Sequence, residues 1–100
     1  MVLVALGDEK VVGYSLTEIR RISPGLKREK YGYIDEMAVT AGYRNKGIGE
    51  KMFTEIMKWF QSKEINRVEI QTTAQNIAAN SFWTKQGFEV YSHTLYRDIK

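Results

Sequence analysis

The hydrophobic pattern changes its period in the middle of the chain, and this change constrains the fold more than any other feature. From Lys30 to Val39 the residues are largely aromatic and aliphatic, which is typical of a β-strand. From Ile48 onward, apolar residues return every three or four positions, which predicts an amphipathic helix. The intervening residues, 40–49, are mostly polar and include three glycines. The sequence therefore predicts a strand, a glycine-rich turn and a helix in direct succession.

Two β-rich runs precede this unit. Val2–Leu6 and Val11–Ile19 are separated by Gly-Asp-Glu-Lys, which predicts a hairpin. The polar stretch 20–30 contains the only proline and is expected to be a loop.

The segments after the helix predict the rest of an α/β (α+β) domain. In residues 67–72 apolar and polar side chains alternate, which predicts a strand. Asn76 is expected to cap a second helix that ends at Gly87. Residues 88–91 and 94–99 are expected to form two closing strands. The expected order is β-β-β-α-β-α-β-β, in a single domain spanning 1–100.

Composition excludes several classes of site. The chain has no cysteine and one histidine, so a thiolate nucleophile, a disulfide and a Cys- or His-rich metal site are not expected. No apolar run approaches the ~20 residues of a membrane span, and the apolar start lacks a basic n-region, so a cytoplasmic location is expected. The net charge is +3, and the basic and acidic residues are interspersed along the chain. This pattern suits a small polyanion better than a nucleic acid.

The turn 44–49 is the strongest candidate for a binding site. It precedes a helix whose first N–H groups and positive dipole end can hold a phosphate. Gly47 and Gly49 remove Cβ atoms where phosphates would approach, and Arg44 and Lys46 add positive charge. A Walker loop is absent, and an ordinary strand-to-helix turn with two glycines has the same pattern.

Two blocks of residues resemble the GCN5-related N-acetyltransferase (GNAT) family. The family motif [QR]-x-x-G-x-[GA], preceded by a hydrophobic-Ala-Val strand end and an aromatic residue, is matched by Met37-Ala38-Val39 and by Tyr43 to Gly49. A second block, Asn-x-x-Ala with an aromatic pair and Gly-Phe, is matched by Asn76 to Phe88. The resemblance implies a GNAT-like mixed, mostly antiparallel, twisted sheet with helices packed on it.

The resemblance also implies acetyl-CoA as cosubstrate and direct attack of an amine on its thioester, without a metal. The backbone N–H of Met37 would contact the thioester carbonyl, and pantetheine would lie along the strand end like a short extra strand. The implied cofactor-binding residues are Met37, Ala38, Val39, Arg44, Asn45, Lys46, Gly47, Ile48, Gly49 and Asn76.

Asp35 and Glu36 are the candidate catalytic carboxylates. An acceptor amine must lose a proton near neutral pH, and a carboxylate can accept it directly or through water. Neighbouring strand residues point to opposite faces, so only one of the two can face the acceptor unless a bulge intervenes. Polyamine-acetylating members of the resembled family carry an acidic pair here, which favours a basic acceptor.

The chain departs from the resembled family in two ways. The usual first strand and helix pair are missing, which leaves the edge of Val2–Leu6 free and predicts a homodimer. A tyrosine that often acts as general acid is replaced by Trp83, so a CoA-binding regulatory or accessory domain without catalysis is the alternative function. Two basic pairs, Arg20-Arg21 and Lys27-Arg28, are possible contacts for the CoA 3′-phosphate.

Overall fold

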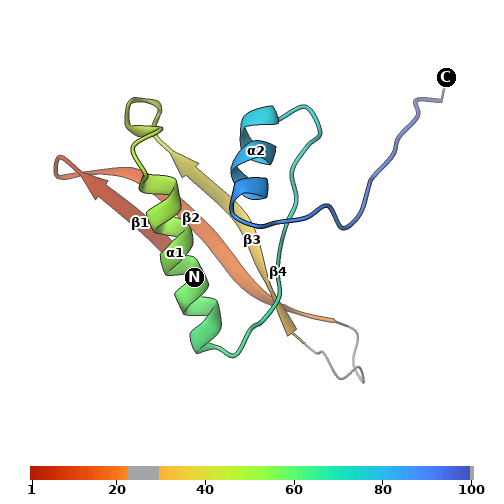
Figure 1. Cartoon of the computed structure of the whole chain (residues 1–100), viewed down its shortest axis with the longest axis horizontal. Coiled ribbons are helices and arrows are strands. Elements are labelled where there is room, and N and C mark those ends of the chain that lie inside the picture. Colours follow the sequence, from red (N-terminus) through yellow and green to blue (C-terminus); the bar gives the residue numbers. More distant parts are fainter. Residues whose placement is uncertain (23–29, 100) are drawn as a thin grey trace.

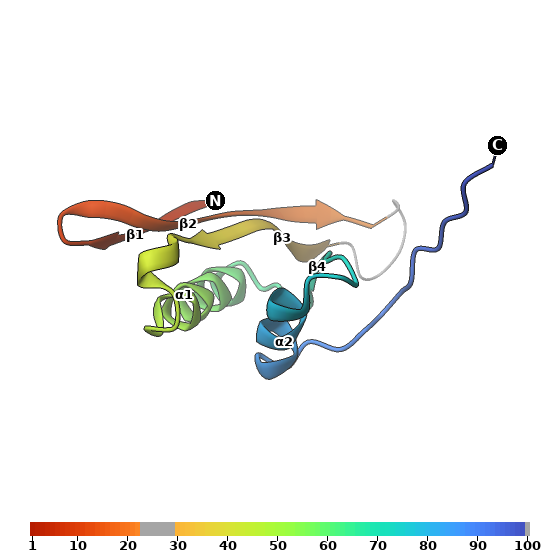
Figure 2. The ribbon, with the colours of Figure 1, turned by 90° about the horizontal axis from the view of Figure 1, so that it is seen from above.

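A four-stranded sheet with two helices on one face forms the body of the protein (Figures 1 and 2). The computed structural model describes residues 1–22 and 30–99. The sheet order is β1-β2-β3-β4; the first two pairings are antiparallel and β4 runs parallel to β3. The elements are β1 (Val2–Gly7), β2 (Lys10–Arg21), β3 (Lys30–Val39), a 3₁₀ turn (Ala41–Tyr43), α1 (Ile48–Ser62), β4 (Val68–Ile70) and α2 (Ile77–Lys85). The mixed, mostly antiparallel α+β architecture is thus confirmed.

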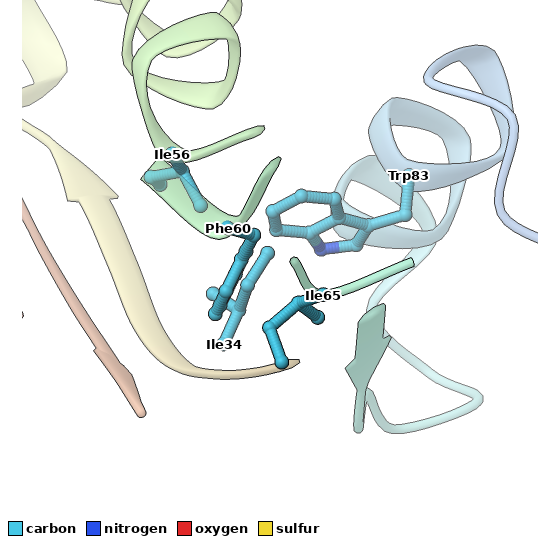
Figure 3. Close-up of a cluster of buried hydrophobic side chains, with 5 residues drawn as sticks. All are labelled: Ile34, Ile56, Phe60, Ile65 and Trp83. Atoms are coloured by element: carbon cyan, nitrogen blue, oxygen red, sulfur yellow. The ribbon is translucent and has the colours of Figure 1, made fainter. Parts of the chain in front are cut away.

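The helix α1 packs its apolar stripe against the sheet. Met52, Ile56 and Phe60 are all buried, as the i, i+4, i+8 spacing predicts. Figure 3 shows Ile56 and Phe60 meeting Ile34 of β3 and Trp83 of α2 in one core cluster. This cluster joins both helices to β3.

Close packing between β3 and α1 requires a glycine at position 32. A Cβ atom built there would lie 2.6 Å from Cε1 of Phe60, well inside van der Waals contact. The Phe60 ring is itself only 1% exposed and has no room to retreat.

The helix α2 has both of the ends that the sequence predicts. The Asn76 side chain accepts a hydrogen bond from Ala79 N at 3.1 Å, which makes it the N-cap. Gly87 has φ +97°, and the N–H of Phe88 donates to Trp83 O at 3.0 Å in a Schellman motif. The Phe88 and Trp83 rings then pack edge to face.

The two closing strands expected at 88–91 and 94–99 are absent. Residues 88–99 form no strand, and in Figure 1 this segment leaves α2 and runs away from the sheet. Five of its apolar side chains are exposed: Val90, Tyr91, Leu95, Tyr96 and Ile99. The alternation of apolar and polar residues shows which side chains a strand would bury. A strand also needs a neighbouring strand to pair with, and this segment has none in the described chain.

Both ends of the loop expected at 20–30 belong to strands instead, since Lys30 begins β3. Arg20 and Arg21 belong to β2, where they pair with Tyr31 and Lys30 of β3. Lys27 and Arg28, the other proposed contacts for a 3′-phosphate, lie outside the described residues. Within the described ranges, no helix is both long and apolar enough to cross a membrane.

Candidate functional site

The turn between β3 and α1 has a backbone that only a few residues adopt easily. Asn45 and Gly47 both have left-handed φ angles, +61° and +81°. Gly47 is the N-cap of α1, and no side chain caps this helix. The local sequence suits this shape, since glycine and asparagine are the residues that best tolerate the left-handed region.

Six consecutive N–H groups in this turn have no well-aligned hydrogen-bond acceptor within the described chain. They belong to residues 45–50, between Arg44, whose N–H donates to Ala41 O, and Lys51, whose N–H donates to Gly47 O. Unpaired donors at a helix N-terminus, together with the helix dipole, favour a bound anion. The turn can therefore hold a phosphate mainly through its backbone.

The two basic side chains of the turn lie in different surroundings. Arg44 donates from Nε to the backbone oxygen of Val39 at 3.0 Å, which ties the turn to the end of β3. Lys46 places its Nζ 5.6 Å from the centre of the Tyr43 ring. Arg44 therefore has a structural bond in addition to its charge.

The end of β3 has a free backbone edge next to this turn. β4 pairs with β3 only as far as Ile34, so residues 35–39 have no strand on that side. The N–H of Thr40 donates to Val12 of β2. Because hydrogen-bonding direction alternates along an antiparallel strand, the polar groups of Met37 and Val39 point away from β2, toward this free edge.

Three elements meet beside Gly49. A Cβ built on Gly49 would lie 3.4 Å from the Phe82 ring of α2 and 3.8 Å from Cε of Met37 in β3. A Cβ built on Gly47 would meet nothing within 4 Å. Gly49 therefore serves close packing at the junction of α1, α2 and β3, whereas Gly47 serves the left-handed turn.

A β-bulge places Asp35 and Glu36 on the same face of the sheet. Leu16 of β2 pairs with Glu36, but the next residue, Thr17, pairs with Ile34, so β3 carries one extra residue. Both carboxylates are exposed, and both have partners on the outward side of β2. The sequence left the question of a bulge open, and the register answers it.

A third carboxylate on this face was not anticipated. Arg20 pairs with both Glu18 and Asp35, at 3.1 and 3.3 Å, and its guanidinium lies 3.5 Å from the centre of the Tyr33 ring. Glu18 alternates outward with Arg20 along β2, but only the strand register shows that it lies beside Asp35. Three carboxylates thus share this face with the Arg20 guanidinium, and the N-terminal ammonium also acts on Glu18 and Asp35.

The carboxylates of this group differ in acidity. Partial burial and the neighbouring Glu18 raise the pKa of Asp35 above its ordinary value, and Arg20 offsets only part of this effect. The pKa of Glu18 is lowered, chiefly by its hydrogen bond with Arg20. Tyr14 donates to Glu36, and this bond raises the pKa of the Tyr14 hydroxyl. Asp35 is thus a stronger base than an ordinary aspartate.

A shallow hollow of about 250 Å³ lies close to this acidic group. Its lining comes from β2 and the end of β3, namely Val11, Gly13, Tyr14, Ala38, Val39 and Thr40. Tyr14 connects the two features, since it lines the hollow and bonds to Glu36.

The second sequence block supplies structure around the site. Trp83 is 7% exposed and points into the core cluster with Phe60 and Ile65 (Figure 3). Asn80, which sequence reasoning missed, donates to Thr73 O at 3.0 Å and bonds to the Thr72 hydroxyl, which fixes the connection from β4 to α2. Tyr91 and Tyr96, the two tyrosines of the segment after α2, are 75% and 85% exposed.

The described residues contain no group of three or more His, Asp or Glu side chains that could hold a metal ion.

Comparison with known proteins identifies the class to which this fold and turn belong. The model of the acetyltransferase (GNAT) family matches residues 1–88. The chain therefore belongs to the GNAT acetyltransferase family.

One curated relative is an uncharacterized N-acetyltransferase, YobR of Bacillus subtilis (strain 168). It is 30% identical over 67 residues, which cover 67% of this chain and 27% of YobR. The chain thus spans about a quarter of the length of this relative.

Solved structures share the fold. A mutant of the BH1408 protein from Bacillus halodurans has a TM-score of 0.89 at 24% identity, covering 99% of this chain and 65% of that one. The aminoglycoside N-acetyltransferase AAC(6')-Iy in complex with CoA has a TM-score of 0.85 at 16% identity, covering 99% of this chain and 75% of that one. At these identities the likeness establishes the GNAT fold.

Proposed function

We propose that this chain binds acetyl-CoA and transfers its acetyl group to an amine of a small molecule or peptide. The observation that carries the proposal is the run of six unpaired N–H groups at the start of α1. Membership of the family and the CoA complex of a structural neighbour support acetyl-CoA as the anion.

In the proposed complex, the N–H groups of Asn45, Lys46, Gly47, Ile48 and Gly49 bind the pyrophosphate. Pantetheine lies along the free edge of β3, beside Met37, Ala38 and Val39, and adds to the sheet as a short strand would. The Arg44 guanidinium contributes charge while it holds the turn, and Asn76 lies at the nearby start of α2.

The proposed chemistry is direct aminolysis of the thioester. The amine nitrogen forms a bond with the acetyl carbon, the thioester C–S bond breaks, and CoA leaves as the thiol or thiolate. The N–H of Met37 stabilises the negative charge on the carbonyl oxygen, as donors in an oxyanion hole do. Asp35 or Glu36 accepts the proton of the amine, directly or through water.

The acidic face favours an acceptor with more than one positive charge. Glu18, Asp35 and Glu36 share this face, and Arg20 and the N-terminal ammonium offset only part of their charge. Several structural neighbours are described as aminoglycoside N-acetyltransferases, and aminoglycosides are polycationic. A thiol-release assay with acetyl-CoA against aminoglycosides, polyamines, amino acids and peptides tests the activity and identifies the acceptor class.

The second candidate function is a CoA-binding regulatory or accessory domain without catalysis. The burial of Trp83 favours it, because an indole in the core cannot protonate the leaving thiolate. Tight CoA binding without thiol release for any amine in the panel would support this alternative.

The phosphate site is tested by replacing Gly49 with Val. The larger side chain disturbs the junction with Phe82 and Met37 and so displaces the N–H groups at the start of α1, and CoA affinity is expected to fall at least tenfold, about 1.4 kcal/mol. The matched control is Gly42→Ala, because a Cβ at Gly42 meets nothing within 4 Å. Calorimetry with CoA and with pantetheine, which has no phosphate, separates loss of the phosphate site from general disruption. Unchanged CoA affinity in a folded Gly49→Val variant would contradict the assignment.

We also propose that the chain works in the cytoplasm as a single domain and as a homodimer. β1 is an edge strand, and Val2, Val4 and Leu6 are exposed on it. Such an edge is a template for association, and a two-fold pair would cover it. Light scattering at micromolar concentration is expected to give twice the monomer mass. Val4→Lys should shift the mass toward monomer, whereas a monomer mass for the unaltered protein across this range would refute the dimer.

A further inference from the structure

Tyr43 links the turn before α1 to the β1–β2 turn, two segments far apart in the sequence. Its hydroxyl donates to Asp8 Oδ2 at 2.6 Å. Its ring lies against Gly7, where a Cβ would be 3.2 Å from Cε1 of Tyr43. Figures 1 and 2 both show the β1–β2 turn and the start of α1 at the same end of the molecule.

Two ammonium groups from these two segments converge on the same ring. Lys10, which opens β2, has its Nζ 5.9 Å from the centre of the Tyr43 ring, and Lys46 has its Nζ at 5.6 Å. Both distances lie within the range of a cation–π contact. The same ring therefore contacts a lysine of the hairpin and a lysine of the turn 44–49.

The Tyr43–Asp8 bond fixes this arrangement at neutral pH. The bond raises the pKa of the Tyr43 hydroxyl above its ordinary value, so the hydroxyl stays protonated and remains the donor. Asp8 thus accepts a hydrogen bond from Tyr43. The other carboxylates of these segments, Glu9 and Glu50, are exposed.

We infer that the β1–β2 turn is part of the phosphate-binding site. Lys10 supplies a cation to the phosphates of CoA, and Tyr43 is a positioning residue that holds Lys10 and the turn 44–49 together. The inference rests on the proposed function, because it assigns new residues to the same CoA site.

The experiment measures the affinity of CoA by calorimetry for the intact chain and four variants. Lys10→Ala should weaken CoA binding roughly two- to fivefold, as expected for an exposed charge, and should reduce its dependence on ionic strength. Tyr43→Phe should weaken it similarly, whereas Asp8→Asn should weaken it less, because the lost positioning is opposed by removal of a negative charge near the phosphates. The control is Lys63→Ala, because Lys63 lies at the far end of α1, where no change is expected.

A double variant separates positioning from general stabilisation. If Tyr43 acts by holding Lys10 in place, then Lys10→Ala with Tyr43→Phe should lose little more affinity than the worse single variant. Pantetheine affinity should be the same in all variants. Independent, additive losses would show that Tyr43 does not position Lys10.

The outcomes distinguish this inference from the proposed function. If the intact chain binds CoA more tightly than pantetheine but Lys10→Ala has unchanged affinity, the inference is wrong and the proposed function stands. If the intact chain binds CoA no more tightly than pantetheine, the phosphate site is absent, and both the inference and the proposed function are wrong.

Discussion

Replacing Asp35 with Asn is expected to lower kcat/KM for acetylation of the best acceptor by about one to three orders of magnitude. The amide keeps the shape of the side chain but cannot accept a proton. Glu36→Gln should have an effect in the same range if Glu36 is the base instead. CoA affinity should be unchanged in both variants, because neither side chain belongs to the turn 44–49. Full activity in both would place the proton acceptor elsewhere or in bulk water.

The pH dependence identifies which carboxylate acts. If Asp35 is the base, kcat/KM should fall at low pH as Asp35 becomes protonated. The midpoint of this acidic limb of the pH profile should lie above the ordinary pKa of an aspartate, because the pKa of Asp35 is raised. Glu18→Gln removes a neighbour that raises this pKa, so the limb should move to lower pH. At pH values well above this limb Asp35 is ionised in both proteins, so any difference in kcat/KM between Glu18→Gln and the unaltered protein reports only the contribution of Glu18 to acceptor binding. A limb that does not move in Glu18→Gln would exclude Asp35 as the base.

Replacing Gly32 with Ala is expected to destabilise the fold by about 1–3 kcal/mol. The added Cβ would lie 2.6 to 2.8 Å from three carbons of the buried Phe60 ring. Pairing with β2 and β4 on either side restrains β3 from moving away. Urea denaturation should show a lower midpoint with a similar slope.

Two further variants test this explanation. Gly32→Ala combined with Phe60→Leu should recover part of the loss, because the ring that causes the clash is gone. Gly42→Ala, at a site with open space, should leave the midpoint nearly unchanged. A midpoint for Gly32→Ala equal to that of the unaltered protein would show that the core can repack around the methyl group.

The sequence predicts the centre of this fold well because its signals there are local. The change of hydrophobic period gives β3 as Lys30–Val39 and the start of α1 at Ile48, and both bounds agree with the structure. Asn76 and Gly87 mark the ends of α2 through backbone chemistry that depends on neighbouring residues alone. Such features need no knowledge of which strands pair.

The features that sequence reasoning missed depend on long-range pairing. The bulge that puts Asp35 and Glu36 on one face arises from the register of β2 against β3, and no local pattern encodes that register. Glu18 joins the group for the same reason. The segment 88–99 has the alternation of a strand, yet it lacks a neighbouring strand within the described chain.

The parallel pairing of β3 with β4 also differs from the other strand pairings in its sequence separation and its length. β1, β2 and β3 are joined by contacts of an antiparallel meander, whereas β4 reaches β3 only after the whole of α1 has been placed, and it pairs through only three residues. During folding, contacts between segments distant in the sequence are expected to form late. In the folded protein, a short strand pairing is expected to open more readily than a long one. Amide exchange is therefore expected to be slowest in β2 and faster in β4 and α2. The proposed pantetheine site lies along the free edge of β3, where Met37 approaches α2, so a bound ligand there is expected to slow amide exchange in β4 and α2 more than in the rest of the sheet.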